Sequence, residues 1–175
     1  VLILQGGGAL GAFECGAVKA LEESKLLPDV VAGVSIGAFN SAIVAGNPNN
    51  PSKALEGFWN DLAVNLADLP DVGVIGSFET MVSAWVSLML GAPKFFQPRW
   101  MKPILNPADL PVNWTSFYDT RPMIKLLTDH VDFDKLNDSP IRLIVTAVDV
   151  ERAELRVFDS FAEKITPEHI LASGS

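Results

Sequence analysis

The chain has 175 residues, of which 49% are hydrophobic and 19% are charged, so it is long enough for one domain with a full hydrophobic core. This composition excludes a disordered segment and a protein with several membrane spans. Thirteen Lys and Arg residues against 21 Asp and Glu residues give a net charge of −8. This acidic balance argues against a nucleic-acid partner and against strong docking on anionic lipid.

The first 45 residues predict two strand–helix units. An apolar strand is expected over 1–5, followed by a helix from Ala9 that ends before Pro28. A second buried strand over 30–34 leads to an uncharged helix over 36–45, and this order predicts a parallel sheet with right-handed crossovers. The apolar face of the first helix is expected to comprise Leu10, Phe13, Ala17, Val18 and Leu21. Its charged face is expected to comprise Glu14, Lys19, Glu22 and Glu23.

A Trp- and Pro-rich insertion is expected at about 51–118, and it contains all four tryptophans of the chain. Within it, an apolar helix over 80–93 is too short to cross a hydrocarbon core of ~30 Å. The aromatic side chains fit ordinary core packing, and they equally fit an acyl-chain groove or lid at a membrane surface. Residues 78–100 are the candidate segment for such peripheral membrane contact.

After the insertion, a helix is expected from Asp119 or Thr120 to about His130. In the run 141–148, the side chains that would lie on both faces of a strand are apolar after Arg142, which predicts a central strand. A neighbouring strand is expected over 155–158. A last helix is expected to begin at 166–168 and to run through Leu171.

The segment GVSIG at 33–37 predicts a nucleophilic serine. It lies between a buried strand and an uncharged helix, where a sharp turn exposes the hydroxyl of Ser35. Gly33 and Gly37 avoid side-chain clashes where strand and helix meet, and the helix N-terminus stabilises negative charge. The alternative is a tight turn in which Ser35 only caps the following helix.

The segment GGGALG at 6–11 supplies the second element of an acyl-transfer site. Backbone amides of Gly6, Gly7 and Gly8 can bind the oxyanion of a tetrahedral intermediate. Gly6, Gly8 and Gly11 also match the GxGxxG pattern of a Rossmann-type dinucleotide-binding domain. That alternative requires an acidic residue at the end of the second strand, where this chain has Val34 and Ser35.

Other reactive side chains are weaker candidates. Asp149 and His169 follow Ser35 in the chain order of an α/β-hydrolase triad, although Asp149 fits a turn and His169 a structural role. His130 suits a helix C-terminus, and Cys15 is expected to be a small buried hydrophobe. The spacing predicts no metal site, and no cofactor is expected.

Together, Gly6–Phe13 and Gly33–Ala38 resemble the bacterial patatin-like phospholipases, and the resemblance extends to 114–119 and to the Ala-Ser-Gly segment at 172–174. The resemblance implies a three-layer α/β/α sandwich with a mostly parallel central sheet. It implies metal-free hydrolysis of acyl esters of phospholipids and other lipids by a Ser–Asp dyad. The glycine loop at 6–8 would form the oxyanion hole.

Two features depart from that family. Leu10 stands where many members have a basic residue, and the chain has no Asp-Gly pair, in which the family's dyad aspartate lies. The sequence is therefore expected to be the N-terminal part of a single catalytic domain, with the base beyond Ser175. A catalytically silent lipid-binding relative stays open as an alternative. We expect a lipid substrate and a cytoplasmic location, with peripheral membrane contact.

Overall fold

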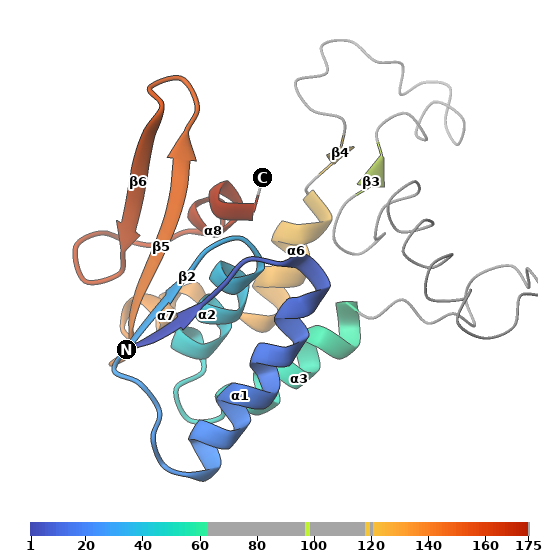
Figure 1. Ribbon diagram of the computed structural model, residues 1–175, viewed down its shortest axis with the longest axis vertical. Coiled ribbons are helices and arrows are strands. Elements are labelled where there is room, and N and C mark those ends of the chain that lie inside the picture. The colour runs from blue at the N-terminus through green and yellow to red at the C-terminus, as the bar shows by residue number, and fades with distance from the viewer. Residues whose placement is uncertain (63–96, 99–117, 120, 175) are drawn as a thin grey trace, which may run out of the picture. The chain divides into compact units, whose positions relative to one another are not determined.

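The computed structural model describes residues 1–62, 97–98, 118–119 and 121–174 (Figure 1). Residues 1–60 and 127–175 form one compact unit, and residues 61–126 form another. The expected insertion at about 51–118 overlaps most of the second unit, whereas residues 51–60 belong to the first. The predicted helix over 80–93 lies outside the described residues, as does the candidate membrane segment 78–100 apart from residues 97–98.

A four-stranded mixed sheet forms the centre of the first unit, in the order β1-β2-β5-β6. Its strands are β1 (Leu2–Leu4), β2 (Val30–Gly33), β5 (Arg142–Asp149) and β6 (Glu154–Asp159). The first three run parallel, with Leu4 beside Gly33 and Gly33 beside Val145, and β6 returns antiparallel to β5. The carboxyl ends of β1 and β2 therefore lie side by side, which brings the two glycine segments together.

The helices are η1 (a 3₁₀ helix, Gly8–Gly11), α1 (Ala12–Glu23), α2 (Ile36–Gly46), α3 (Pro51–Leu62), α6 (Arg121–His130), α7 (Phe133–Asn137) and α8 (Pro167–Gly174). In the second unit, β3 (Gln97–Pro98) pairs antiparallel with β4 (Tyr118–Asp119). Helix α2 packs against β1, β2 and β5, and α8 packs against β5. The predicted α/β class with a mostly parallel central sheet is confirmed, and the arrangement is consistent with a three-layer sandwich.

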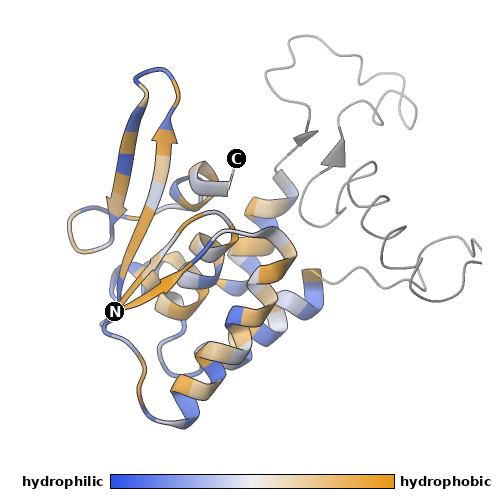
Figure 2. Ribbon diagram, in the orientation of Figure 1, coloured by the Kyte–Doolittle hydropathy of each residue, from blue (hydrophilic) through white to orange (hydrophobic). Residues whose placement is uncertain are grey.

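Helix α2 is the centre of the core, because all eleven of its residues are buried. Its lack of charged residues predicts this burial. Val31, Leu143 and Val145 contribute buried side chains from the strands, and Leu55 and Phe58 contribute them from α3. Figure 2 shows β1 as hydrophobic along its length, whereas α1 alternates hydrophobic and hydrophilic residues. The sheet and α2 thus form the rigid base for the glycine segments.

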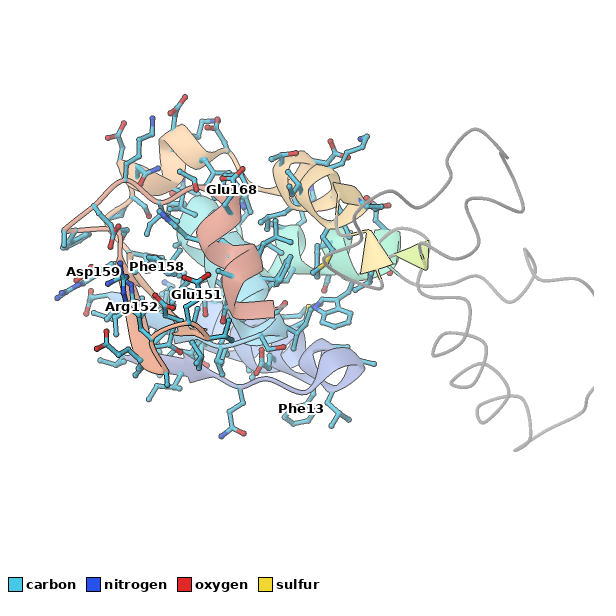
Figure 3. The ribbon with its side chains drawn as sticks, turned by 90° about the horizontal axis from the view of Figure 1, so that it is seen from above. Phe13, Glu151, Arg152, Phe158, Asp159 and Glu168 are labelled. Atoms are coloured by element: carbon cyan, nitrogen blue, oxygen red, sulfur yellow. The ribbon has the colours of Figure 1, made fainter. Side chains whose placement is uncertain are left out.

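The predicted apolar face of the first helix is wrong for three residues. Leu10 is 78% exposed, Phe13 is 84% exposed and Ala17 is exposed too, whereas Val18 is fully buried. Glu14, expected on the solvent side, is half-buried and accepts hydrogen bonds from Gln5 and from α2. These bonds turn the start of α1 so that Glu14 lies toward α2, and Phe13 therefore points outward (Figure 3).

Candidate active site

Ser35 lies in a sharp turn between β2 and α2. Its φ of 55° and ψ of −127° place a residue with a side chain in a left-handed conformation that favours glycine. Such strain persists only where the surrounding structure imposes it, and it is frequent at functional sites. The structure therefore places Ser35 in the strained strand–helix turn that the GVSIG segment predicts.

The glycines on both sides of Ser35 are required by contact with neighbouring backbone. A Cβ atom at position 33 would lie 2.2 Å from the carbonyl oxygen of Gly37, and one at position 37 would lie 2.2 Å from the carbonyl oxygen of Leu4. No real Cβ makes such contacts, so β1, β2 and α2 can approach this closely only with glycine at both positions. This close packing fixes the backbone that carries Ser35.

The hydroxyl of Ser35 does not cap helix α2. Ser35 occupies the N-cap position, yet its side chain makes no capping hydrogen bond. The expectation that Ser35 serves only as a cap is therefore not met, because a capping serine accepts a bond from an amide in the first turn. The hydroxyl lies at the N-terminus of a buried helix, where the helix dipole favours negative charge.

The backbone amide of Ser35 is held by Ser173. It donates a hydrogen bond of 2.9 Å to Oγ of Ser173 on α8, and that hydroxyl in turn donates to the carbonyl oxygen of Thr146 on β5 at 2.6 Å. In the sequence, Ser173 stands out only as part of the segment that carries the family resemblance. Nothing in the local pattern predicts the contact, because the two serines are 138 positions apart.

The glycine loop lies directly against Ser35. A Cβ atom on Gly6 would lie 3.1 Å from Cβ of Ser35 and 3.8 Å from its Oγ. Gly7 and Gly8 have φ values of 156° and 57°, and η1 begins at Gly8. Within the described part of the chain, the amides of these three glycines donate to no other residue. The structure thus places Gly6 against Ser35 and leaves the three loop amides without an acceptor in this part of the chain.

The residues of the alternative triad are engaged elsewhere. Asp149 accepts bonds from the amides of Glu151 and Arg152 in the turn between β5 and β6, and it pairs with the Arg152 side chain at 3.4 Å. The His169 ring stacks on Phe158 with centroids 4.3 Å apart, and its Nδ1 accepts from the Thr166 amide. Figure 3 labels Arg152 and Phe158 on this hairpin. The structure does not bring Asp149, His169 and Ser35 into one hydrogen-bonded triad.

His130 and Cys15 also lie in packing environments. The His130 ring meets Phe58 edge-on, with centroids 5.8 Å apart, and its backbone carbonyl accepts from Asn47. Cys15 is half-buried on α1, and burial raises the pKa of its thiol above the ordinary range, with the nearby Glu56 carboxylate adding to the shift. A raised thiol pKa lowers the reactive thiolate fraction, so Cys15 suits a structural role.

The described residues offer neither a metal-ligand cluster nor a membrane span. Among them, no group of three or more His, Cys, Asp or Glu side chains is placed to hold a metal ion. No helix in the same part of the chain is long and apolar enough to cross a membrane.

The chain is similar in sequence to several known proteins. The family model described as patatin-like phospholipase matches residues 2–175. A triacylglycerol lipase, SDP1L of Arabidopsis thaliana, is 46% identical over 63 residues, which are 35% of this chain and 8% of that protein. The lysophospholipase nte1 of Aspergillus terreus is 52% identical over 44 residues, which are 25% of this chain and 3% of that protein.

A patatin-like phospholipase domain-containing protein of Pyricularia oryzae is 46% identical over 54 residues, which are 31% of this chain and 7% of that protein. The matched segments thus span less than a tenth of each of these relatives. Among solved structures, the type III effector protein ExoU aligns with 99% of this chain and 38% of its own, at 19% identity and a TM-score of 0.39.

Proposed function

Because the chain belongs to the patatin-like phospholipase family, we propose that it is a lipid acyl hydrolase with Ser35 as its nucleophile. The observation that carries this proposal is the turn at Ser35, in which a strained backbone holds a hydroxyl that is not used as a helix cap. The names of the relatives, a triacylglycerol lipase and a lysophospholipase, support a lipid ester as the substrate class.

The reaction follows from the chemistry of an activated serine. A base removes the hydroxyl proton, Oγ attacks the ester carbonyl carbon, and the carbonyl oxygen becomes an oxyanion. The intermediate then expels the alcohol, which takes up the proton, and leaves an acyl group on Oγ. Water hydrolyses this acyl ester in a second cycle and restores the serine.

The amides of Gly6, Gly7 and Gly8 are the proposed donors to the oxyanion. The Ser35 amide already donates to Ser173, whereas the loop that begins at Gly6 lies against Ser35 and offers backbone donors. Donors that are fixed before the reaction stabilise developing charge without reorganisation, and one such donor contributes ~3 kcal/mol to the transition state.

The base is proposed to be an aspartate that forms a dyad with Ser35. Within the described residues, no carboxylate or imidazole is hydrogen-bonded to the Ser35 hydroxyl. The proposed position of this aspartate is C-terminal to Ser175, in the Asp-Gly pair that the family resemblance implies. Peripheral contact with membranes is proposed for the aromatic-rich segment at 78–100, together with a cytoplasmic location.

Hydrolysis by matched serine variants tests this function. In the full chain, Ser35→Ala should lower kcat on a short-chain ester and on phosphatidylcholine vesicles by about 10⁴- to 10⁶-fold. Ser41 lies on the same helix, and its buried hydroxyl has no hydrogen-bond partner among the described residues, so Ser41→Ala should retain full activity. A wild-type protein that binds vesicles but hydrolyses neither substrate would identify a silent lipid-binding relative. Nicotinamide or flavin dinucleotide binding without hydrolysis would favour the dinucleotide-binding alternative.

A further inference from the structure

The glycine loop at 6–8, which connects β1 to the start of η1, needs support from side chains outside it. Glycine loses more conformational freedom on folding than any other residue, so three consecutive glycines do not hold a fixed geometry by themselves. An oxyanion hole nevertheless works only when its donors are held in place before the reaction. Side chains must therefore fix the loop both where it leaves β1 and where the chain enters α1.

One carboxylate holds the entry to the loop. The backbone amide of Gln5, directly before Gly6, donates to Oε1 of Glu14 at 2.7 Å. Glu14 lies in the first turn of α1, so this bond ties the end of β1 to the helix that follows the loop. A hydrogen bond to an ionised acceptor is about twice as strong as one between neutral groups.

One amide side chain holds the exit from the loop and closes the ring of bonds. Nδ2 of Asn40 donates to the carbonyl oxygen of Gly11 at 3.0 Å and to Oε2 of Glu14 at 2.8 Å. Glu14 therefore accepts from the loop entry through one oxygen and from Asn40 through the other. The loop is closed by a chain of three hydrogen bonds from Gln5 to Gly11.

The orientation of Asn40 is fixed by its partners. Its Oδ1 accepts from Nε1 of Trp59 at 3.1 Å, and an indole nitrogen can only donate. The Gly11 carbonyl and the Glu14 carboxylate can only accept, so a flipped amide would lose all three bonds. Asn40 is fully buried, where such losses are costly.

Asn40 also connects the loop to the nucleophile. It lies on α2, which begins at Ile36 directly after Ser35. Its bond to Gly11 therefore sets the distance between the glycine loop and the helix that carries the serine turn. Gly11 packs tightly against neighbouring side chains, because a Cβ there would lie 2.9 Å from Cγ2 of Ile36 and 3.1 Å from Trp59.

From this arrangement we infer that Glu14 and Asn40 are positioning residues that hold the oxyanion-hole loop against the Ser35 turn. The inference rests on the proposed function. Neither side chain touches the reacting atoms in this role. Their loss loosens the donors relative to Oγ, and the effect is therefore greater on kcat than on KM.

The test compares two glutamates of the same helix in the full chain. Glu14→Gln keeps an acceptor for the Gln5 amide but presents an NH₂ group to Asn40, so the ring opens. Glu22→Gln is the matched control, because Glu22 on α1 accepts from the Ser52 amide at 3.1 Å at the other end of the helix. Three measurements are made on each variant: kcat and KM on a soluble ester, the melting temperature, and hydrogen–deuterium exchange of the amides at 6–11.

For Glu14→Gln we expect kcat to fall about tenfold or more with KM within about twofold, since removal of a whole oxyanion donor costs about 10²–10³ in rate. Amide exchange at 6–11 should accelerate. Glu22→Gln should change neither kcat nor the amide exchange at 6–11, even if the melting temperatures of the two variants fall equally. Trp59→Phe removes only the donor that orients Asn40, and it should cause a smaller loss of kcat in the same direction.

Equal kcat values for Glu14→Gln and Glu22→Gln would overturn the inference, and so would unchanged exchange at 6–11. The exchange measurement needs no activity, so it stays decisive if Ser35→Ala retains hydrolysis and the proposed function fails. Conversely, an inactive Ser35→Ala with a fully active Glu14→Gln would reject the positioning role alone.

Discussion

The backbone amide of Ser35 donates to the hydroxyl of Ser173, 138 positions further along the chain, at 2.9 Å. Because Ser173 also donates to the Thr146 carbonyl, one hydroxyl links the serine turn, helix α8 and strand β5. The strained turn is therefore held by a contact separate from the glycine loop, and the geometry of Ser35 depends on a residue outside its own motif.

Ser173→Ala should lower both stability and rate. It leaves the half-buried Ser35 amide without its acceptor, which costs up to ~1–3 kcal/mol, and it releases the turn. The control is Ser160→Ala, because the half-buried Ser160 hydroxyl accepts from the Leu143 amide at 2.9 Å away from the site. Urea unfolding and ester hydrolysis should show similar stability losses but a rate loss only for Ser173→Ala. Equal rates in the two variants would refute this account of Ser173.

Alanine at two glycines should have opposite effects on stability. Gly37→Ala places a Cβ 2.2 Å from the backbone of Leu4, so we expect a loss of more than ~4 kcal/mol and little folded protein. Gly16 is exposed in the interior of α1, and an added Cβ would meet no atom within 4 Å apart from the helix's own nearby backbone. Gly16→Ala should therefore stabilise the protein by up to ~1 kcal/mol through helix propensity. Melting temperatures check both, and a well-folded Gly37→Ala would contradict the described turn.

Phe13 should affect activity on lipid surfaces more than activity in solution. It is 84% exposed just after the glycine loop, and under the proposed function an exposed aromatic side chain there inserts into the lipid–water interface. Phe13→Asp should reduce hydrolysis of phosphatidylcholine vesicles more than hydrolysis of a soluble short-chain ester. Leu26→Asp is the control, because Leu26 is 66% exposed and follows the other end of α1. Equal losses on both substrates would exclude a role at the lipid surface.

The ion pair between β5 and β6 should make stability depend on pH. Nε of Arg142 donates to Oδ1 of Asp159 at 2.9 Å and Nη2 donates to Oδ2, and these bonds hold the pKa of Asp159 below its ordinary range. A lowered folded-state pKa stabilises the protein above the unfolded value of ~3.9, and that stabilisation is lost as pH falls through the folded value. The gap in unfolding free energy between wild type and Asp159→Asn should shrink as the pH is lowered from neutral toward the folded-state pKa. A constant gap would show that the carboxylate charge contributes nothing.

The elements around the two glycine segments can be predicted because their signals are local. An apolar run followed by glycines predicts a strand that ends at a turn, and the uncharged run after Ser35 predicts a buried helix. The observed β1, β2 and α2 agree with those expectations to within two residues at each end. The strand predicted over 141–148 is also central, lying between β2 and β6.

Helices α3 and α7 could not be predicted, because their local sequence patterns are weak. Helix α3 falls within the expected irregular insertion, although Pro51 at its first position and the apolar pair Leu55 and Phe58 fit a helix that starts there. Helix α7 spans only five residues, and its start depends on the Asp132 side chain, which accepts from the amides of Asp134 and Lys135. Such short helices give no usable periodicity.

The support of the site cannot be predicted from the sequence, because it depends on long-range contacts. Helical periodicity places Glu14 on a solvated face, whereas tertiary hydrogen bonds to Gln5 and Asn40 bring it to the glycine loop. Asn40 is a polar residue in a mostly apolar helix, and its partners lie in two distant segments, Gly11 and Glu14 at the start of α1 and Trp59 on α3. Motif spacing predicts Ser35 as the nucleophile and the glycines as donors, whereas the folded structure shows which contacts hold these segments.

Covalent labelling of Ser35 tests the central claim most directly. The full chain is treated with a fluorophosphonate, which reacts with activated serine hydroxyls, and the modified peptide is identified by mass spectrometry. The proposed mechanism predicts a single adduct on Ser35 that appears at the same rate as activity is lost, and no labelling of Ser35→Ala. An adduct on another serine, or full ester hydrolysis by Ser35→Ala, would contradict it.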